Sequence, residues 1–299
     1  SFSGGATTGS STVTGLTISK AAVTITANGT VSSKVFDTTT NALITANSSG
    51  TVALGNSTAA NGTTVINAFT AINSTATFTN ASAAATQSIN LTDALRDTTN
   101  YTITSGANAT LATGNTISKA TVTITANGTV SDKIYDKGTN TSVSTNSTGV
   151  VALGNSAQAN GTTNSSTAFT AISSTATFTN ATAANTQTIN ITNALLDTTN
   201  YSIASGATAT SATGNTISKA AVTVTTNATV ANKVFDTTTN ALVTANSTGT
   251  VALGNSTAAN GTTATPTGFT DINTTATFTS ASAAASQTVN LTDVLRDTV

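Results

Sequence analysis

The chain has 299 residues, of which 37% are hydrophobic, 4% aromatic and 6% charged, with a net charge of -1 and no Cys, His or Glu. This balance excludes the basic surface that nucleic-acid binding requires, and the missing cysteines exclude disulfides and thiolate metal sites. No apolar run approaches the roughly 20 residues of a membrane helix, so we expect no membrane insertion. Abundant β-branched residues at low net charge favour ordered strands over disorder.

Three copies of one sequence unit fill the chain. Ile18-Ser19-Lys20-Ala21 returns at 117–120 and at 217–220, with spacings of 99 and 100 residues, and Val-Ala-Leu-Gly-Asn recurs at the same intervals. Each unit of about 100 residues has the size of an ordinary domain. We expect residues 1–16 to be a terminal strand belonging to a preceding or neighbouring module, 17–115 to be module 1, 116–215 module 2, and 216–299 a third module that lacks its last strand.

Alternation of apolar and polar residues dominates each unit. Ala22–Thr26, Ala76–Thr79 and Tyr101–Thr104 alternate in this way, which is typical of half-buried strands, and Asn-Gly pairs between such runs supply turns. About seven short strands per unit predict an antiparallel β-sandwich. Thr92–Asp97 is the one helix-like segment, where Thr or Asp could cap a single turn, and 106–115 is expected to be a short link between modules.

A second motif combines a cation, a ring and an acid. Lys34-Val35-Phe36-Asp37-Thr38-Thr39 returns in variant form at 133–138 and 233–238. Because aromatic residues are scarce, a ring that contributes roughly 1.5–3 kcal/mol on burial should anchor the core. The Asp should hold the following turn or pair with Lys34. The structural residues we expect are Phe36, Asp37, Tyr135, Asp136, Phe235, Asp236, Phe78, Phe178 and Phe278.

Taken in order, three motifs resemble the YDG-type repeat, related to the MBG repeats, of large secreted bacterial adhesins similar to filamentous haemagglutinin. They are residues 18–26, the Lys-aromatic-Asp motif at 34–39, and Asp97–Ile103, and they cover essentially the whole chain through its three copies. The resemblance implies tandem immunoglobulin-like modules in an elongated, exported, extracellular protein without catalytic residues or cofactors.

The motif departs from the family at one position. The family's Tyr-Asp-Gly reads Phe36-Asp37-Thr38, and the other copies place Lys137 and Thr237 at the Gly position. If that Gly has a positive φ, we expect the turn to be remodelled here.

Other chemistries remain open at this stage. A Lys–Asn or Lys–Asp isopeptide crosslink could use Lys20 or Lys34, with Asp37, Asp93 or Asp97 as the buried acid. Threonine arrays permit an ice-binding interpretation, although Ala, Asn and turns interrupt their spacing. Catalysis would depend on Asp or Lys residues that recur in every copy, and a single active site would not be triplicated. Calcium needs six to eight oxygen ligands, whereas the acids are dispersed. We therefore expect no enzyme, no cofactor and no metal.

Asn-x-Ser/Thr triplets are abundant in all three units. We hypothesise that a subset on turns carries glycan that shields a weakly charged surface. These residues are Asn28, Asn61, Asn127, Asn160 and Asn260.

The function expected from the sequence is mechanical: a stalk or filament of a bacterial surface adhesin or of an extracellular biofilm matrix, at the cell surface or secreted. Expected partners are neighbouring copies or flanking modules, and a host, surface or matrix ligand through regions outside this fragment. One alternative is a self-assembling fibre or surface-layer subunit in which residues 1–16 complete the open third module of a neighbour. A carbohydrate- or receptor-binding module would need features unique to one copy, which are Tyr135, Lys137, Pro266 and Asp271.

Overall fold

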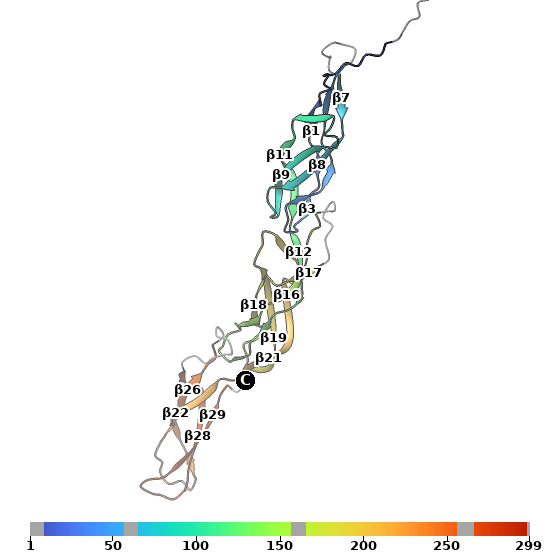
Figure 1. The fold of residues 1–299 in the computed structure, drawn as a ribbon. Helices are drawn as coiled ribbons and strands as arrows, with labels where there is room; N and C mark the ends of the chain where they lie inside the picture. The colour runs from blue at the N-terminus through green and yellow to red at the C-terminus, as the bar shows by residue number, and fades with distance from the viewer. Residues whose placement is uncertain (1–8, 57–64, 157–165, 256–265, 298–299) are drawn as a thin grey trace, which may run out of the picture. The chain divides into compact units, whose positions relative to one another are not determined.

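The computed structural model describes residues 9–56, 65–156, 166–255 and 266–297, which form an all-β fold without a helix (Figure 1). Contacts divide the chain into two compact units. Unit 1 comprises residues 1–120 and 152–166, and unit 2 comprises residues 121–151 and 167–299. Unit 1 thus combines the first sequence repeat with residues 152–166 of the second.

The first repeat forms two main sheets and a two-stranded ribbon. The strands of the first sheet, in spatial order, are β10 (Tyr101–Ser105), β1 (Ala21–Ala27), β6 (Ser49–Leu54) and β7 (Val65–Phe69). Those of the second are β3 (Lys34–Val35), β11 (Asn108–Ser118), β9 (Ala84–Leu95), β8 (Ile72–Phe78) and β4 (Asn41–Ala42). The ribbon pairs β2 (Thr30–Val31) with β5 (Ile44–Ala46).

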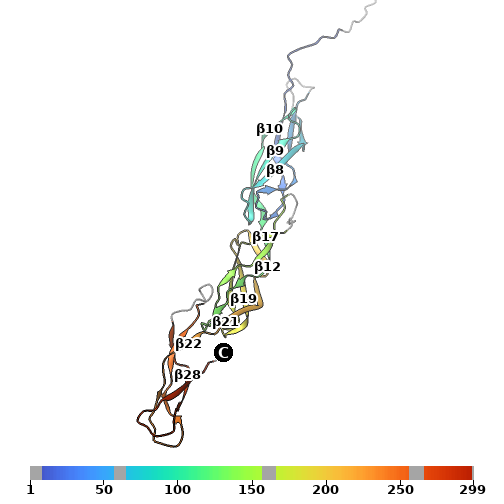
Figure 2. The same cartoon turned by 60° about the horizontal axis from the view of Figure 1, so that its bottom comes forward.

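The second repeat has the corresponding strands, and Figure 2 shows two of the longest, β19 and β21, side by side. One sheet contains β17 (Thr167–Phe169), β16 (Thr148–Ala152), β12 (Ala120–Ala126) and β20 (Tyr201–Ser205). The other contains β14 (Lys133–Ile134), β21 (Thr208–Ser218), β19 (Ala184–Leu195) and β18 (Ile172–Phe178), and β13 (Thr129–Val130) pairs with β15 (Val143–Thr145).

The third repeat has smaller sheets within the described residues. One contains β22 (Ala221–Thr226), β26 (Thr248–Ala252) and β27 (Thr267–Phe269), and the other β24 (Asn240–Ala241), β28 (Ile272–Phe278) and β29 (Val289–Leu295). A ribbon pairs β23 (Thr229–Val230) with β25 (Val243–Ala245). Here β29 is an edge strand, whereas its counterparts β9 and β19 lie between two neighbours.

The all-β class expected from the sequence is confirmed, but the sheets expected to be antiparallel are mixed. Strand β1 pairs antiparallel with β6 but parallel with β10, and β3 and β14 run parallel to β11 and β21. The parallel partners are separated by long stretches of chain, as parallel pairing requires. Alternation along each strand correctly indicated strands but carried no information about their direction.

Two further expectations are also wrong. Thr92–Asp97 is not helical, since β9 continues to Leu95 and alternates buried Leu91 and Asp93 with exposed residues. Asp97 instead accepts backbone hydrogen bonds from Thr99 and Asn100 in the turn that follows. The expected link at 106–115 is mostly strand β11, which pairs with β9 over most of its length.

The core of the first repeat is built from small clusters. Val23, Val52, Phe69 and Ile72 form one, and the Tyr101 ring lies 4.9 Å from that of Phe69. The second repeat repeats this ring pair with Phe169 and Tyr201 at 4.9 Å. A separate cluster in the second repeat surrounds Phe178, which is 2% exposed, as is Phe78 in the first.

A chain of buried hydrogen bonds crosses each repeat. In the first, the Gly29 N–H donates to Ser48, the Ser48 N–H donates to Ser74, and the Ser74 hydroxyl donates to Asp93 Oδ1. The second repeat has Asn193 in place of Asp93, and its amide also donates to the Gly206 carbonyl at 2.9 Å. Among the described residues, Asp93 Oδ2 is a buried oxygen without a hydrogen-bond partner.

Asp93→Asn should therefore stabilise the first repeat. The new amide can donate to the backbone as Asn193 does, for a gain of about 1 kcal/mol in the free energy of unfolding. Hydrogen exchange of peptides from β8 and β9 measures this change. Asn193→Asp is the matched control, with the opposite effect on β18 and β19. Weaker protection of β9 in Asp93→Asn would contradict the prediction.

Candidate functional site

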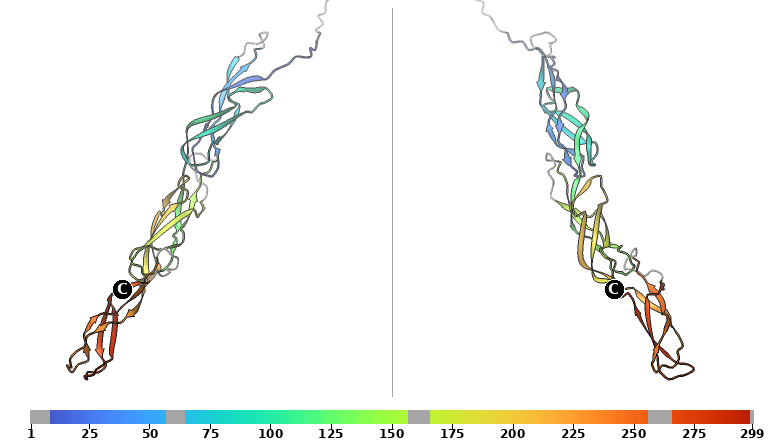
Figure 3. Two further views of the ribbon diagram at one scale, coloured as in Figure 1. Left: turned by 90° about the vertical axis from the view of Figure 1, so that its left-hand side faces the viewer. Right: turned by 180° about the vertical axis from the view of Figure 1, so that it is seen from behind.

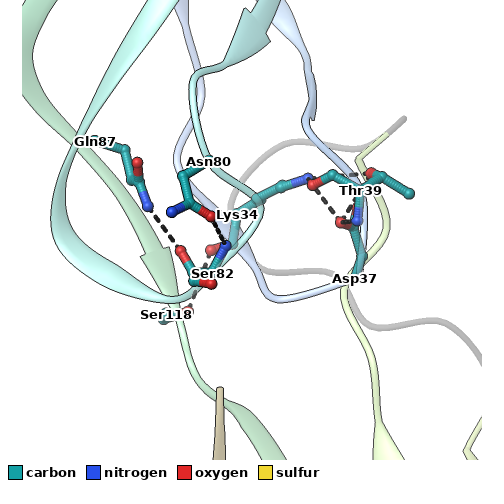
Figure 4. Close-up of polar contacts among 7 residues, drawn as sticks. All are labelled: Lys34, Asp37, Thr39, Asn80, Ser82, Gln87 and Ser118. Atoms are coloured by element: carbon teal, nitrogen blue, oxygen red, sulfur yellow. Dashed lines mark hydrogen bonds and ion pairs between the residues drawn. The ribbon is translucent and has the colours of Figure 1, made fainter. Parts of the chain in front are cut away.

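The Lys-aromatic-Asp motif folds into what we call the signature turn, comprising residues 34–39, 133–138 and 233–238. Lys34 Nζ donates to Asp37 Oδ1 at 2.7 Å and to the Thr39 carbonyl at 2.7 Å (Figure 4). The same carboxylate oxygen accepts the N–H and the hydroxyl of Thr39, each at 2.9 Å. The expected Lys34–Asp37 pair is thus present, while Lys20 bonds to the Thr98 carbonyl at 2.6 Å.

The turn places its cation over a core ring. Lys34 Nζ lies 5.5 Å from the centroid of the Phe78 ring, and the side chains of Lys34 and Asp37 are 4% and 7% exposed. Lys133 over Phe178 and Lys233 over Phe278 repeat this at 5.7 Å and 5.6 Å. A cation over an aromatic face is attracted by the ring quadrupole, most strongly where water is excluded.

Hydrogen bonds keep Asp37 and Asp236 ionised. Burial raises the pKa of Asp37, but hydrogen bonds from Lys34, Thr39 and Ser156 outweigh it and hold the pKa below its ordinary value. In the third repeat, the hydrogen bond from Lys233 and those from Thr238 lower the pKa of Asp236 to about 2. The stability contributed by these carboxylates is complete above the unfolded pKa of about 4 and is lost as pH falls toward 2.

The residue after the Asp of the signature turn has a positive φ in all three copies. The φ angles of Thr38, Lys137 and Thr237 are 68°, 69° and 67°. A β-branched residue rarely adopts this conformation, which costs about 1–2 kcal/mol. The bonds to the Asp carboxylate and the Lys ammonium hold the turn in place despite this cost.

Thr38→Gly should consequently raise the free energy of unfolding of the first repeat by about 1 kcal/mol, because glycine adopts a positive φ without a steric penalty. Hydrogen exchange of peptides spanning 34–42 reports the change. Thr39→Gly is the control: it removes the hydroxyl bond to Asp37 and should lower protection. Loss of protection in Thr38→Gly would contradict the interpretation of strain.

The turn also joins one repeat to the next. The Phe36 N–H donates to the Ser118 carbonyl at 2.8 Å, and its own carbonyl accepts the Gly154 N–H at 2.9 Å. A Cβ built on Gly154 would overlap the Val35 carbonyl oxygen, so only glycine fits there. Tyr135 repeats the pair of bonds with Ser218 and Gly254, at 2.8 Å and 2.9 Å.

The expected core role differs among the three copies. Phe36 is 7% exposed and Tyr135 is partly buried, whereas Phe235 is 59% exposed. Asp236 is likewise more exposed than Asp37 and Asp136. In the first two copies, the turn contacts the end of a following strand and a glycine of the next repeat. Among the described residues, the third copy has neither of these contacts.

The contribution of the ion pair to the stability of a repeat should depend on how deeply the pair is buried. Lys34→Ala leaves Asp37 buried and unpaired and should destabilise the first repeat by about 3–5 kcal/mol. Lys233→Ala, at the more exposed copy of the same pair, should cost much less, because solvent screens an exposed pair. Hydrogen exchange of peptides around each turn compares the two variants in one chain. Equal losses of protection would show that burial does not control the contribution of the pair.

The glycosylation candidates divide into two groups. Asn28 and Asn127 are exposed at turns that precede Gly29 and Gly128. Asn61, Asn160 and Asn260 lie outside the described residues.

Sequence reasoning missed Gly154 and Gly254 as contact residues. The signal was present, because Val-Ala-Leu-Gly-Asn recurs in every repeat, but nothing in the motif indicated its partner. Within the described ranges, no group of three or more Asp side chains is placed to hold a metal ion, and no helix has the length and hydropathy to cross a membrane. Comparisons with protein-family models, curated proteins and solved structures found no match to this chain.

Proposed function

We propose that this chain is a non-enzymatic structural repeat region that forms a stalk or filament of a bacterial surface adhesin or extracellular matrix fibre. The observation that carries the proposal is the signature turn. Its charged groups bond to one another and to the turn backbone, and the backbone of its ring residue bonds to Ser118 and Gly154. Groups used in this way position neighbouring repeats and are not directed at a ligand.

The proposal includes three tandem immunoglobulin-like sandwiches of about 100 residues in an elongated, extracellular protein. In such arrays each repeat contacts only its neighbours, and stability is roughly a sum over repeats and their interfaces. The length of the array therefore grows with the number of copies. The recurrent glycine contact supports this interpretation, because the same bond forms at Gly154 and at Gly254. The similarity of the three motifs to the YDG-type repeat supplies the assignment to surface adhesins.

Localisation provides the most direct test. Antibodies raised against the 299-residue chain should label intact source cells or their extracellular matrix, and external protease should remove the label. Labelling that requires permeabilised cells would overturn the proposal. Peptide mapping of the native protein tests the glycan hypothesis separately: glycan at exposed Asn28 or Asn127 supports it, and unmodified Asn at both positions and at Asn61, Asn160 and Asn260 removes it.

A second candidate is a self-assembling fibre or surface-layer subunit. In the described residues β29 is an edge strand, and an edge strand presents backbone groups with which a further strand, of the same or of another chain, can pair. A denaturing gel of the native protein separates the two candidates. A band near 29.2 kDa, the mass of this chain, indicates a subunit, and a far larger band indicates a stalk within a longer polypeptide.

A further inference from the structure

We infer that strands β1 and β10 of the first repeat form a mechanical clamp that resists tension applied along the chain. The clamp, as we call this contact, comprises residues 21–24 and 100–105. The inference rests on the proposed stalk function, since a stalk is pulled through the two ends of each repeat, and it names the contact that carries this load.

Backbone and side-chain hydrogen bonds join the two strands of the clamp. The strands pair parallel, beginning with Ala21 opposite Tyr101. The Ala21 N–H donates to the Asn100 carbonyl at 2.8 Å, and the Thr104 hydroxyl donates to the Val23 carbonyl at 3.1 Å. Val23 is 0% exposed, so the middle of the contact is part of the core.

The chain leaves the clamp in the direction in which β10 runs. Only Gly106 and Ala107 separate β10 from β11, and the Ala107 carbonyl accepts the Asp93 N–H at 2.8 Å. This bond extends the antiparallel pairing of β11 with β9 back to the end of β10, so β10 and β11 both run opposite to β9. Lys119 alone then joins β11 to β12, so a pull from the second repeat reaches β11 without a flexible linker.

Tension therefore pulls the two strands of the clamp in opposite directions. A pull from Lys20 acts on β1 toward its first residue, and a pull from Lys119 acts on β11 and β10 toward their last residues. Cross-strand hydrogen bonds lie across the strand axes, so this load shears all of them together. A pull that separates the same ends of two strands breaks the bonds one after another and needs less force.

Gly106 holds the crossing from one sheet to the other against β1. Its φ is 86°, and a Cβ built on it would lie 2.6 Å from Ile25 Cβ, so the backbone of the crossing packs directly on β1. In the second repeat β20 lies beside β12, and Gly206, with a φ of 85°, approaches Ile124 in the same way. The second repeat therefore has the parts of an equivalent clamp.

The direction of pulling tests the clamp within one chain. The chain contains no cysteine, so two introduced cysteines can serve as attachment points for single-molecule force spectroscopy. T17C/K119C loads β1 and β10 in shear, whereas T17C/T99C pulls the same ends of the two strands apart, and all three positions are exposed. Hydrogen exchange that matches the unmodified chain shows that each variant is folded before it is pulled. The first repeat should unfold at roughly twofold or higher force in T17C/K119C, because its cross-strand bonds must break together.

A point substitution tests the contact itself. Thr104→Val removes the hydroxyl that donates to the Val23 carbonyl, so it should lower the unfolding force in T17C/K119C and leave that in T17C/T99C nearly unchanged. Thr102→Val is the matched control, because Thr102 is another exposed threonine of β10, and it should change neither force.

The outcomes separate the clamp from the stalk proposal. Equal unfolding forces in the two pulling directions, or a lower force in T17C/K119C, would overturn the inference. Equal effects of Thr104→Val and Thr102→Val would also reject it. Each of these results leaves the stalk proposal to the localisation test, whereas a direction-dependent force in a chain found only inside cells would reject the stalk and keep the clamp.

Discussion

The first two repeats depend on satisfying a lysine ammonium that is removed from water. A buried charge is costly unless it is paired and fully hydrogen-bonded, and Lys34 meets this requirement with Asp37, the Thr39 carbonyl and the face of Phe78. The requirement explains the spacing of the motif. Asp three residues after Lys reaches the ammonium only if the chain turns sharply, and that turn contains the residue with positive φ.

The same turn exposes a backbone segment that other parts of the chain must complete. Both polar backbone groups of Phe36 are bonded, one to the end of β11 and the other to Gly154 of the next repeat. Buried backbone groups are rarely left unpaired, so the contact between repeats follows from the geometry of the turn. A glycine is needed because the two backbones approach too closely for a side chain.

The third repeat is an internal comparison with nearly the same sequence. Its turn keeps the ion pair, the ring contact and the positive φ, so these depend on local sequence. Its Phe235 ring is exposed and β29 is an edge strand, so burial of the corresponding groups in the first two repeats depends on the neighbouring strand and loop. Figure 3 shows the backbone of the third repeat, coloured orange to red, from two sides. The local structure of the signature turn therefore does not require the neighbouring strand and loop that bury it in the first two repeats.

The amino-acid sequence alone determined the three repeats, the all-β class and the pairing of Lys34 with Asp37. Each of these follows from short-range regularities, namely period-2 alternation and a cation three residues before an acid. Sequence patterns also placed the aromatic residues of the motif, although they did not distinguish buried Phe36 from exposed Phe235.

Only the tertiary structure decided which strands are neighbours and in which direction they run. The parallel pairs β1–β10 and β3–β11 join segments some 80 residues apart, and no local pattern encodes such a partner. The tertiary structure also continues strand β9 to Leu95 where a helical turn was expected, and it assigned Gly154 to Phe36. The sequence predicted the ion pair of the signature turn. It did not predict the contact of this turn with the next repeat, because that contact depends on backbone atoms from distant segments.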